Sequence, residues 1–207
     1  GNVYQYFVNG SSQGAPTVSN NLTLSTLFDG DVISVVAYSA QGCTDTTEML
    51  PLTVNPAPAT TLVSSDPNNE ICIGDNVDFT ASGATEYEFF INGMSQGPPG
   101  TNPVFSTAGL ANGDNITVIG TQLGCSTTSN NLNFTVFGYP VVSLFNNGEL
   151  EICTGENTDL TAVGADNYQF QINAVPFGPF SPVNTFTAPL NNGDVVTVLG
   201  ETNGCAS

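Results

Sequence analysis

The chain of 207 residues contains 18 aspartates and glutamates but no lysine, arginine or histidine, so its net charge is -18. Nucleic acids and anionic lipids are bound through basic side chains, and this composition excludes both as partners. Most enzymes also use imidazole, ammonium or guanidinium groups for proton transfer and charge stabilisation, so we expect a protein that is not an enzyme. No apolar run reaches the length of a membrane-spanning helix, and we expect no membrane insertion.

Short strands with alternating apolar residues are predicted along the whole chain, and no stretch shows a helical period. In chain order, the side chains expected to face inward are Val77, Phe79 and Ala81, then Tyr87, Phe89 and Ile91, then Ile116 and Val118, then Leu132, Phe134 and Val136, and finally Tyr168, Phe170 and Ile172. Asn-Gly and Asp-Gly pairs between them favour tight turns, because both residue types tolerate positive φ. The pattern predicts antiparallel sandwiches with Greek-key connections.

Three segments repeat nearly the same sequence. DGDVISVVAYSAQGC at 29–43 is followed by NGDNITVIGTQLGC at 112–125 and NGDVVTVLGETNGC at 192–205. The period is about 81 residues, and a fixed period indicates repeated structural units. We therefore predict tandem immunoglobulin-like β-sandwich domains joined by stiff proline-bearing linkers.

The predicted domain boundaries follow from this period. Residues 1–56 are expected to be the C-terminal part of one repeat and residues 57–138 a complete repeat. Residues 139–207 are expected to be a third repeat that lacks its last strand.

Five regularly placed cysteines, with no histidine to share a metal site, favour disulfides and an extracellular location. The simplest pairing is within a repeat, joining Cys72 to Cys125 and Cys153 to Cys205, and it leaves Cys43 to a partner outside the chain. The two ends of a sandwich are far apart for such a bond. A bond between Cys72 and Cys205 across the joint of two repeats is therefore the alternative.

The repeat unit, with ICxGxxVxFTASGA, YxFxxNG, NGDxxTV and GCxS in succession, resembles a known group over the whole chain. It is similar to the immunoglobulin-like or PKD-like repeats that occur in tandem in large secreted surface proteins of Bacteroidota. These include gliding-motility adhesins and other products of the type IX secretion route. The resemblance implies a cell-surface or extracellular stalk, adhesin or filament component.

Carboxylates near the repeated turns are candidate calcium ligands, because calcium prefers oxygen atoms. The candidates are Asp29, Asp31, Asp114 and Asp194. We expect ordinary turn chemistry at these positions, and a calcium site is the alternative. Beyond calcium, no cofactor is predicted. Asp45-Thr46-Thr47 is similar to the O-glycan acceptor pattern of Bacteroidota, which makes Thr46 a candidate glycosylation site.

Carboxylate pairs and exposed aromatic residues allow other functions to be considered. Glycoside hydrolysis uses a pair of carboxylates. Glu86 with Glu88, and Glu149 with Glu151, are two positions apart and would share a strand face, but we interpret them as solvated surface. Apolar residues out of phase with the core rows are Phe7, Val36, Phe90, Ile119 and Leu199. They indicate a sheet face that could contact neighbouring chains or a ligand.

The predicted function is a non-catalytic structural segment of an extracellular stalk, filament or adhesin on a bacterial surface. Its expected partners are neighbouring copies of the repeat, other chains of a filament, and a surface or glycan ligand. The alternative is a carbohydrate-binding or accessory module of a secreted polysaccharide-degrading enzyme, which would bind glycans through Tyr139 or Phe177.

Overall fold

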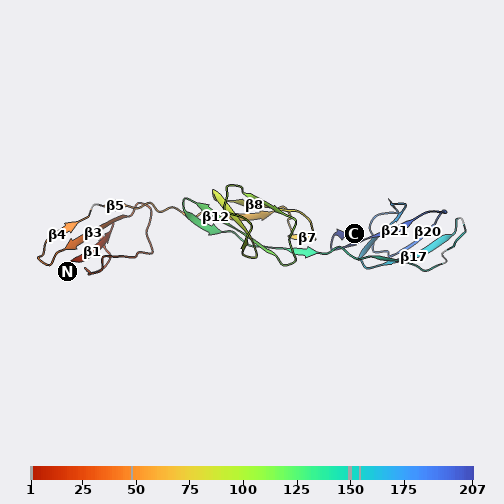
Figure 1. Ribbon diagram of the computed structural model, residues 1–207, viewed down its shortest axis with the longest axis horizontal. Coiled ribbons are helices and arrows are strands. Elements are labelled where there is room, and N and C mark those ends of the chain that lie inside the picture. Colours follow the sequence, from red (N-terminus) through yellow and green to blue (C-terminus); the bar gives the residue numbers. More distant parts are fainter. Residues whose placement is uncertain (1, 48, 149–150, 154) are drawn as a thin grey trace. The chain divides into compact units, whose positions relative to one another are not determined.

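Strands form the regular secondary structure of the chain, and the described residues contain no helix (Figure 1). The structure is a computed structural model that describes residues 2–47, 49–148, 151–153 and 155–207. Glu149, a member of one predicted carboxylate pair, lies outside the described residues. Within the described ranges, no helix has the length and apolar character needed to cross a bilayer. The chain divides into two compact units, residues 1–58 with 121–126, and residues 59–120 with 127–207.

Residues 2–58 form a single five-stranded antiparallel sheet of order β2-β1-β3-β4, in which β5 also pairs with β3. Its strands are β1 (Val3–Val8), β2 (Ser11–Ser12), β3 (Val32–Tyr38), β4 (Thr44–Thr46) and β5 (Leu50–Pro51). β1 and β3 pair along their length, from Val3 opposite Tyr38 to Val8 opposite Ile33. Every side chain of these two strands is only half-buried.

Residues 59–137 form two antiparallel sheets and one parallel strand pair. The strands are β6 (Thr61–Ser64), β7 (Glu70–Cys72), β8 (Val77–Ser82), β9 (Glu86–Ile91), β10 (Met94–Ser95), β11 (Val104–Thr107), β12 (Asn115–Gln122), β13 (Cys125–Thr128), β14 (Leu132–Asn133) and β15 (Thr135–Phe137). One sheet has the order β10-β9-β12-β13 with β14 on β12, and the other has the order β11-β8-β6. β7 and β15 run parallel, which the sequence pattern did not predict.

The remaining strands form two further antiparallel sheets. They are β16 (Ser143–Asn146), β17 (Asn157–Val163), β18 (Asn167–Ile172), β19 (Val175–Pro176), β20 (Thr185–Pro189), β21 (Val196–Thr202) and β22 (Cys205–Ala206). The sheet orders are β16-β17-β20 and β19-β18-β21-β22.

Two separate apolar clusters lie inside the second compact unit, and strand alternation explains both. On β8 every second side chain is buried and the others are exposed, so one face of the strand supplies the core. One cluster is centred on Leu62, Ile71, Val77, Phe79, Ala81, Tyr87, Phe89, Leu110, Ile116, Val118 and Phe134. The other is centred on Leu160, Ala162, Tyr168, Phe170, Phe186 and Ala188.

These clusters confirm the predicted all-β fold, with tandem immunoglobulin-like sandwiches. The buried residues include the predicted inward rows of β8, β9, β12 and β18, while Ile91, Leu132, Val136 and Ile172 are partly buried at the core edge. The clusters fall within 57–138 and 139–207, and the domain boundaries themselves stay predictions.

Candidate functional site: the disulfide joint

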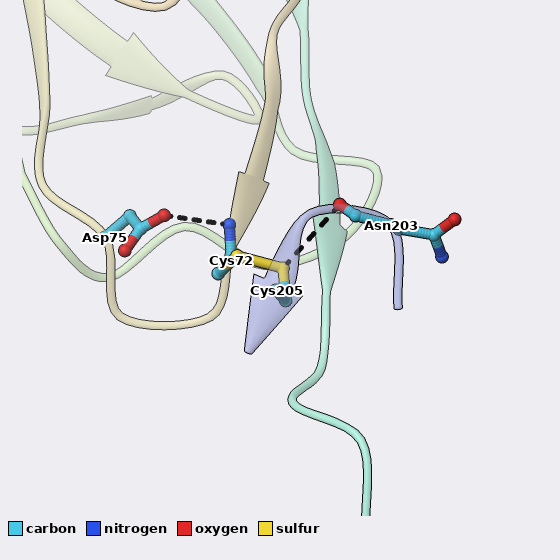
Figure 2. The surroundings of a disulfide bond; sticks show 4 residues. All are labelled: Cys72, Asp75, Asn203 and Cys205. Carbon is cyan, nitrogen blue, oxygen red and sulfur yellow. Dashed lines mark hydrogen bonds between the residues drawn. A yellow bond between two sulfur atoms is a disulfide. The ribbon is translucent and has the colours of Figure 1, made fainter. Parts of the chain in front are cut away.

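The chain contains a disulfide between Cys72 and Cys205, which belong to different repeats (Figure 2). The two residues are 133 positions apart in the sequence, and their Cα atoms lie 5.6 Å apart. This Cα separation is typical of disulfides. The bond therefore joins the second repeat to the third across the proline-bearing linker.

A local turn and a strand pairing hold Cys72 in place. Cys72 ends β7, and its register partner in the parallel pair is Phe137 of β15. The Ile73 amide donates to the Phe137 carbonyl at 2.8 Å. On the other side, the Cys72 amide donates to Asp75 Oδ2 at 3.0 Å, and the Asp75 amide donates to the Cys72 carbonyl at 3.0 Å.

Cys205 is positioned by a tight hairpin between β21 and β22. Thr202 is its register partner, and the two turn residues Asn203 and Gly204 have φ of 52° and 78°. Positive φ at both central positions is typical of a type I′ turn, which explains the Asn-Gly sequence. The Cys205 side chain is 1% exposed. The Asn203 carbonyl oxygen lies 4.0 Å from its Sγ, and this is a contact, since a disulfide sulfur has no proton to donate.

The preferred within-repeat pairing was wrong for Cys72 and Cys205. Cys72 lies beside Phe137, at the end of its repeat that leads into the next one. Cys125 lies at the other end, where its Sγ is 3.4 Å from the carbonyl oxygen of Asn55. The two ends of one sandwich are thus occupied by different cysteines. Among the described residues, Cys43, Cys125 and Cys153 are not disulfide-bonded.

The repeated NGD turn is held by an Asn–Asp pair that occurs three times. In each repeat one Asp oxygen accepts from an Asn side-chain amide and the other accepts from a backbone amide. The Asn amides are those of Asn9, Asn92 and Asn173, at 2.6, 2.7 and 2.8 Å from Asp31, Asp114 and Asp194. The backbone amides are those of Phe28, Ala111 and Asn191, at 2.7, 2.8 and 2.8 Å.

The same asparagines complete the turn from the other side. Their side-chain oxygens accept from the backbone amides of Val32, Asn115 and Val195, at 2.9, 3.0 and 3.0 Å. In Asp31 the hydrogen bond from the Phe28 amide, followed by that from Asn9, lowers the pKa of the carboxyl group. The Asn191 amide and Asn173 lower the pKa of Asp194 in the same way. These carboxylates are therefore structural elements of the turn.

The calcium candidates have their oxygens engaged by protein donors. Both oxygens of Asp31, Asp114 and Asp194 accept hydrogen bonds, and Asp29 Oδ1 accepts from the Val54 amide at 3.0 Å. In the described part of the chain, no three acidic, histidine or cysteine side chains lie close enough to hold a metal ion. Ordinary turn chemistry stays the prediction for these carboxylates, and a calcium site stays its alternative. Thr46 is exposed on β4, and its glycosylation also stays a prediction.

The other predicted surface residues do not form one site. Glu88 Oε1 accepts from Ser95 Oγ at 2.7 Å, and Glu86 is exposed on the same strand. Phe177 is 57% exposed but packs edge-on against Phe186, with ring centroids 5.1 Å apart. Tyr139 is 47% exposed. The out-of-phase apolar residues, Phe7, Val36, Phe90, Ile119 and Leu199, are half-buried.

Comparisons with known proteins give only distant structural likeness. No family model matches the sequence, and no curated protein is significantly similar to it. Fibronectin(III)-like modules of Clostridium thermocellum CbhA are 14% identical, with a TM-score of 0.44, over 71% of this chain and 89% of that one. An ICAM-5 D1–D4 ectodomain fragment is 12% identical, with a TM-score of 0.39, over 100% of this chain and 65% of that one. The FN1–FN3 domains of chicken CNTN1 are 10% identical, with a TM-score of 0.36, over 99% of this chain and 85% of that one.

Proposed function

We propose that the chain is a non-catalytic, load-bearing segment of an extracellular stalk, filament or adhesin on a bacterial surface. The repeat motifs favour the type IX-secreted surface proteins of Bacteroidota as its source. Neighbouring copies of the repeat, and other chains of a filament, are its proposed partners. A surface or glycan ligand would be bound elsewhere on the complete assembly.

The Cys72–Cys205 bond carries this proposal. A disulfide that only stabilised a sandwich could lie inside one repeat, whereas this bond connects two. Tension applied to the ends of the chain passes through the bond and bypasses the residues between the two cysteines. Residues 73–204 are then shielded from load, whereas β6 and β7 of the second repeat stay on the loaded path. Disulfides persist in oxidising compartments, which supports an extracellular location.

The charge distribution supports the same role. With 18 acidic residues and no basic ones, neighbouring segments repel each other, and the repulsion keeps a long polymer hydrated and separate at low salt. The Asn–Asp turns satisfy the buried carboxylate Asp31 without any cation. The fold therefore does not need ion pairs.

Single-molecule stretching tests the load-bearing role. The chain is held by its two ends and extended with the disulfide intact and again after reduction. Because the bond encloses 133 sequence positions, and an extended chain spans at most about 3.3–3.6 Å per residue, reduction should release about 440–480 Å of extra length. The variant Cys72→Ser should behave like the reduced chain without any reductant.

Two outcomes would contradict the proposal. Equal extension of the oxidised and reduced chains would show that the bond does not carry the load. Specific binding of the chain to a glycan array, abolished by Phe177→Ala or Tyr139→Ala, would favour the carbohydrate-binding alternative.

A further inference from the structure

Three cysteines outside the disulfide occupy the same two structural positions as the bonded pair. Cys153 lies in the position of Cys72: its amide donates to Glu156 Oε2 at 3.0 Å, and the Glu156 amide donates back to its carbonyl at 3.0 Å. Asp75 makes the same two bonds with Cys72. We call this position the turn cysteine.

The other position is that of Cys205, which follows a glycine at the end of a strand hairpin. Cys125 has the same place as the first residue of β13, after a turn from β12 in which Leu123 and Gly124 have φ of 50° and 80°. Cys43 likewise follows Gly42, and it lies immediately before β4, which pairs with β3. We call this position the hairpin cysteine.

The surroundings of Cys125 match those of a joint. The residue beside its Sγ is Asn55, which ends a Thr-Val-Asn sequence at 53–55. The equivalent Thr-Val-Phe sequence at 135–137 is β15, and its last residue is the register partner of the bonded Cys72. The Asn55 side-chain amide also donates to the Leu123 carbonyl at 3.0 Å. A turn cysteine paired with residue 55 would therefore lie next to the Cys125 thiol.

The sheet of residues 2–58 has an open apolar face that indicates where this turn cysteine comes from. Tyr6, Leu27, Ile33 and Val35 are half-buried and line a groove of about 410 Å³ with Leu22 and Leu24. Their equivalents in the second repeat, Phe89, Leu110, Ile116 and Val118, are all buried. The same cluster includes Leu62 of β6 and Val77, Phe79 and Ala81 of β8, and these two strands flank Cys72 in the sequence. The groove thus lies where the strands equivalent to β6 and β8 would cover this sheet.

We propose that the repeats are joined by an overlapping series of disulfides, in which each hairpin cysteine bonds the turn cysteine of the preceding repeat. The occupant of the groove is a segment ahead of Gly1 that is equivalent to residues 57–83, and its turn cysteine bonds Cys125. Cys153 bonds the hairpin cysteine of a following repeat, and Cys43 bonds a turn cysteine further upstream. The same rule assigns Cys72 to Cys205.

Each bond forms by thiol–disulfide exchange. The two cysteine thiols lose two protons and two electrons as the S–S bond forms. A disulfide oxidant accepts the two electrons and two protons and is released as two thiols. Because successive bonds overlap along the sequence, two parallel covalent paths would run from repeat to repeat. One path follows the chain from Cys43 to Cys72 and crosses a disulfide to Cys205. The other follows the chain from Cys125 to Cys153 and crosses a disulfide to the following repeat. This inference does not rest on the proposed stalk role, because cysteine pairing is measured without load.

The test is a chain extended at its N-terminus by a second copy of residues 57–83, refolded with glutathione disulfide. We expect a linked peptide that contains Cys125 and the added cysteine, and at least a tenfold loss of Cys125 labelling by iodoacetamide. The unextended chain should keep Cys125 reactive. The matched control carries the same extension with its cysteine replaced by serine, and in it the groove is filled while Cys125 remains reactive.

The Cys72–Cys205 peptide reports folding in every variant. If it is present while Cys125 of the extended chain stays reactive, the proposal is wrong. Linkage of the added cysteine to Cys43, or of Cys125 to a second copy of the chain, would also overturn it. Should the extended chain not refold, the same peptide map of the secreted protein from its natural source decides, and Cys125 bonded within its own repeat would refute the proposal.

Discussion

Residues 1–56 and 57–138 carry the same strand pattern but bury it to different degrees. Ile116 and Val118 of β12 are 0% exposed, whereas the equivalent Ile33 and Val35 of β3 are half-buried. The difference comes from the opposite sheet, which is β11-β8-β6 in the second repeat and has no counterpart among the described residues 2–47 and 49–58. An alternating strand therefore defines a core face, and a second sheet is needed to make that face a core.

The largest expected effect is the difference in unfolding free energy between two matched substitutions, one in each region. Ile116→Ala should cost about 2–5 kcal/mol, because it removes a fully buried side chain and leaves a cavity. Ile33→Ala should cost less than about half as much, since its side chain is already partly in water. Hydrogen exchange of the β12 and β3 amides measures each local free energy of opening. Equal costs would contradict the difference in packing.

A glycine on β12 sharpens the comparison further. A Cβ at Gly120 would lie 2.3 Å from Thr60 Oγ1 and 2.7 Å from Ala84 Cβ. Gly120→Ala should therefore destabilise the second repeat by about 1–3 kcal/mol through overpacking. The equivalent residue of the first repeat is Ala37, and Ala37→Gly should cost only about 0.5–1 kcal/mol. Thermal unfolding of both variants checks the contrast. An unchanged Tm for Gly120→Ala would show that Thr60 and Ala84 can move away from the added Cβ without cost.

A smaller effect concerns the Asn–Asp turns. Since the folded pKa of Asp194 lies below its ordinary value of 3.8, its stabilisation is present above that pH and is lost as the pH falls through the folded pKa. Acid also relieves repulsion among the 18 carboxylates, which acts in the opposite direction. The difference between the parent chain and Asp194→Asn isolates the turn. We expect the Tm difference to shrink as the pH drops below about 4, and a constant difference would contradict this assignment.

The smallest expected effect is that of calcium. Both carboxylate oxygens of Asp31, Asp114 and Asp194 already accept protein hydrogen bonds. Millimolar calcium or a chelator should therefore leave the Tm unchanged. A clear rise with calcium, absent at equal ionic strength of sodium, would show that the ion replaces these donors.

Much of the fold could be predicted from sequence, because period-two alternation is a local property. Val77, Phe79 and Ala81 are buried as the pattern predicts. The parallel pairing of β7 with β15 was missed, because it joins the start and end of a repeat and nothing in either strand encodes its partner. The Asn–Asp pairs had a visible signal, since Asn9, Asn92 and Asn173 recur with the NGD turns. Recognising it required knowing that β1 and β3, and their equivalents, are neighbours.

The cysteine pairing shows the same limit. A short loop is the simplest choice from sequence, but bond formation depends on which ends of the sandwiches meet. Cys72 and Cys205 are the more distant pair along the chain, yet β7 and β22 bring their Cα atoms to 5.6 Å. Spacing alone therefore left two connectivities open.

Non-reducing peptide mapping of the 207-residue chain tests the covalent joint most directly. Trypsin has no site in a chain without lysine and arginine, whereas proteases specific for Asp and Glu cut between every pair of cysteines. We predict one linked peptide containing Cys72 and Cys205, with Cys43, Cys125 and Cys153 alkylated. Linked peptides that join Cys72 to Cys125, or Cys153 to Cys205, would contradict the account.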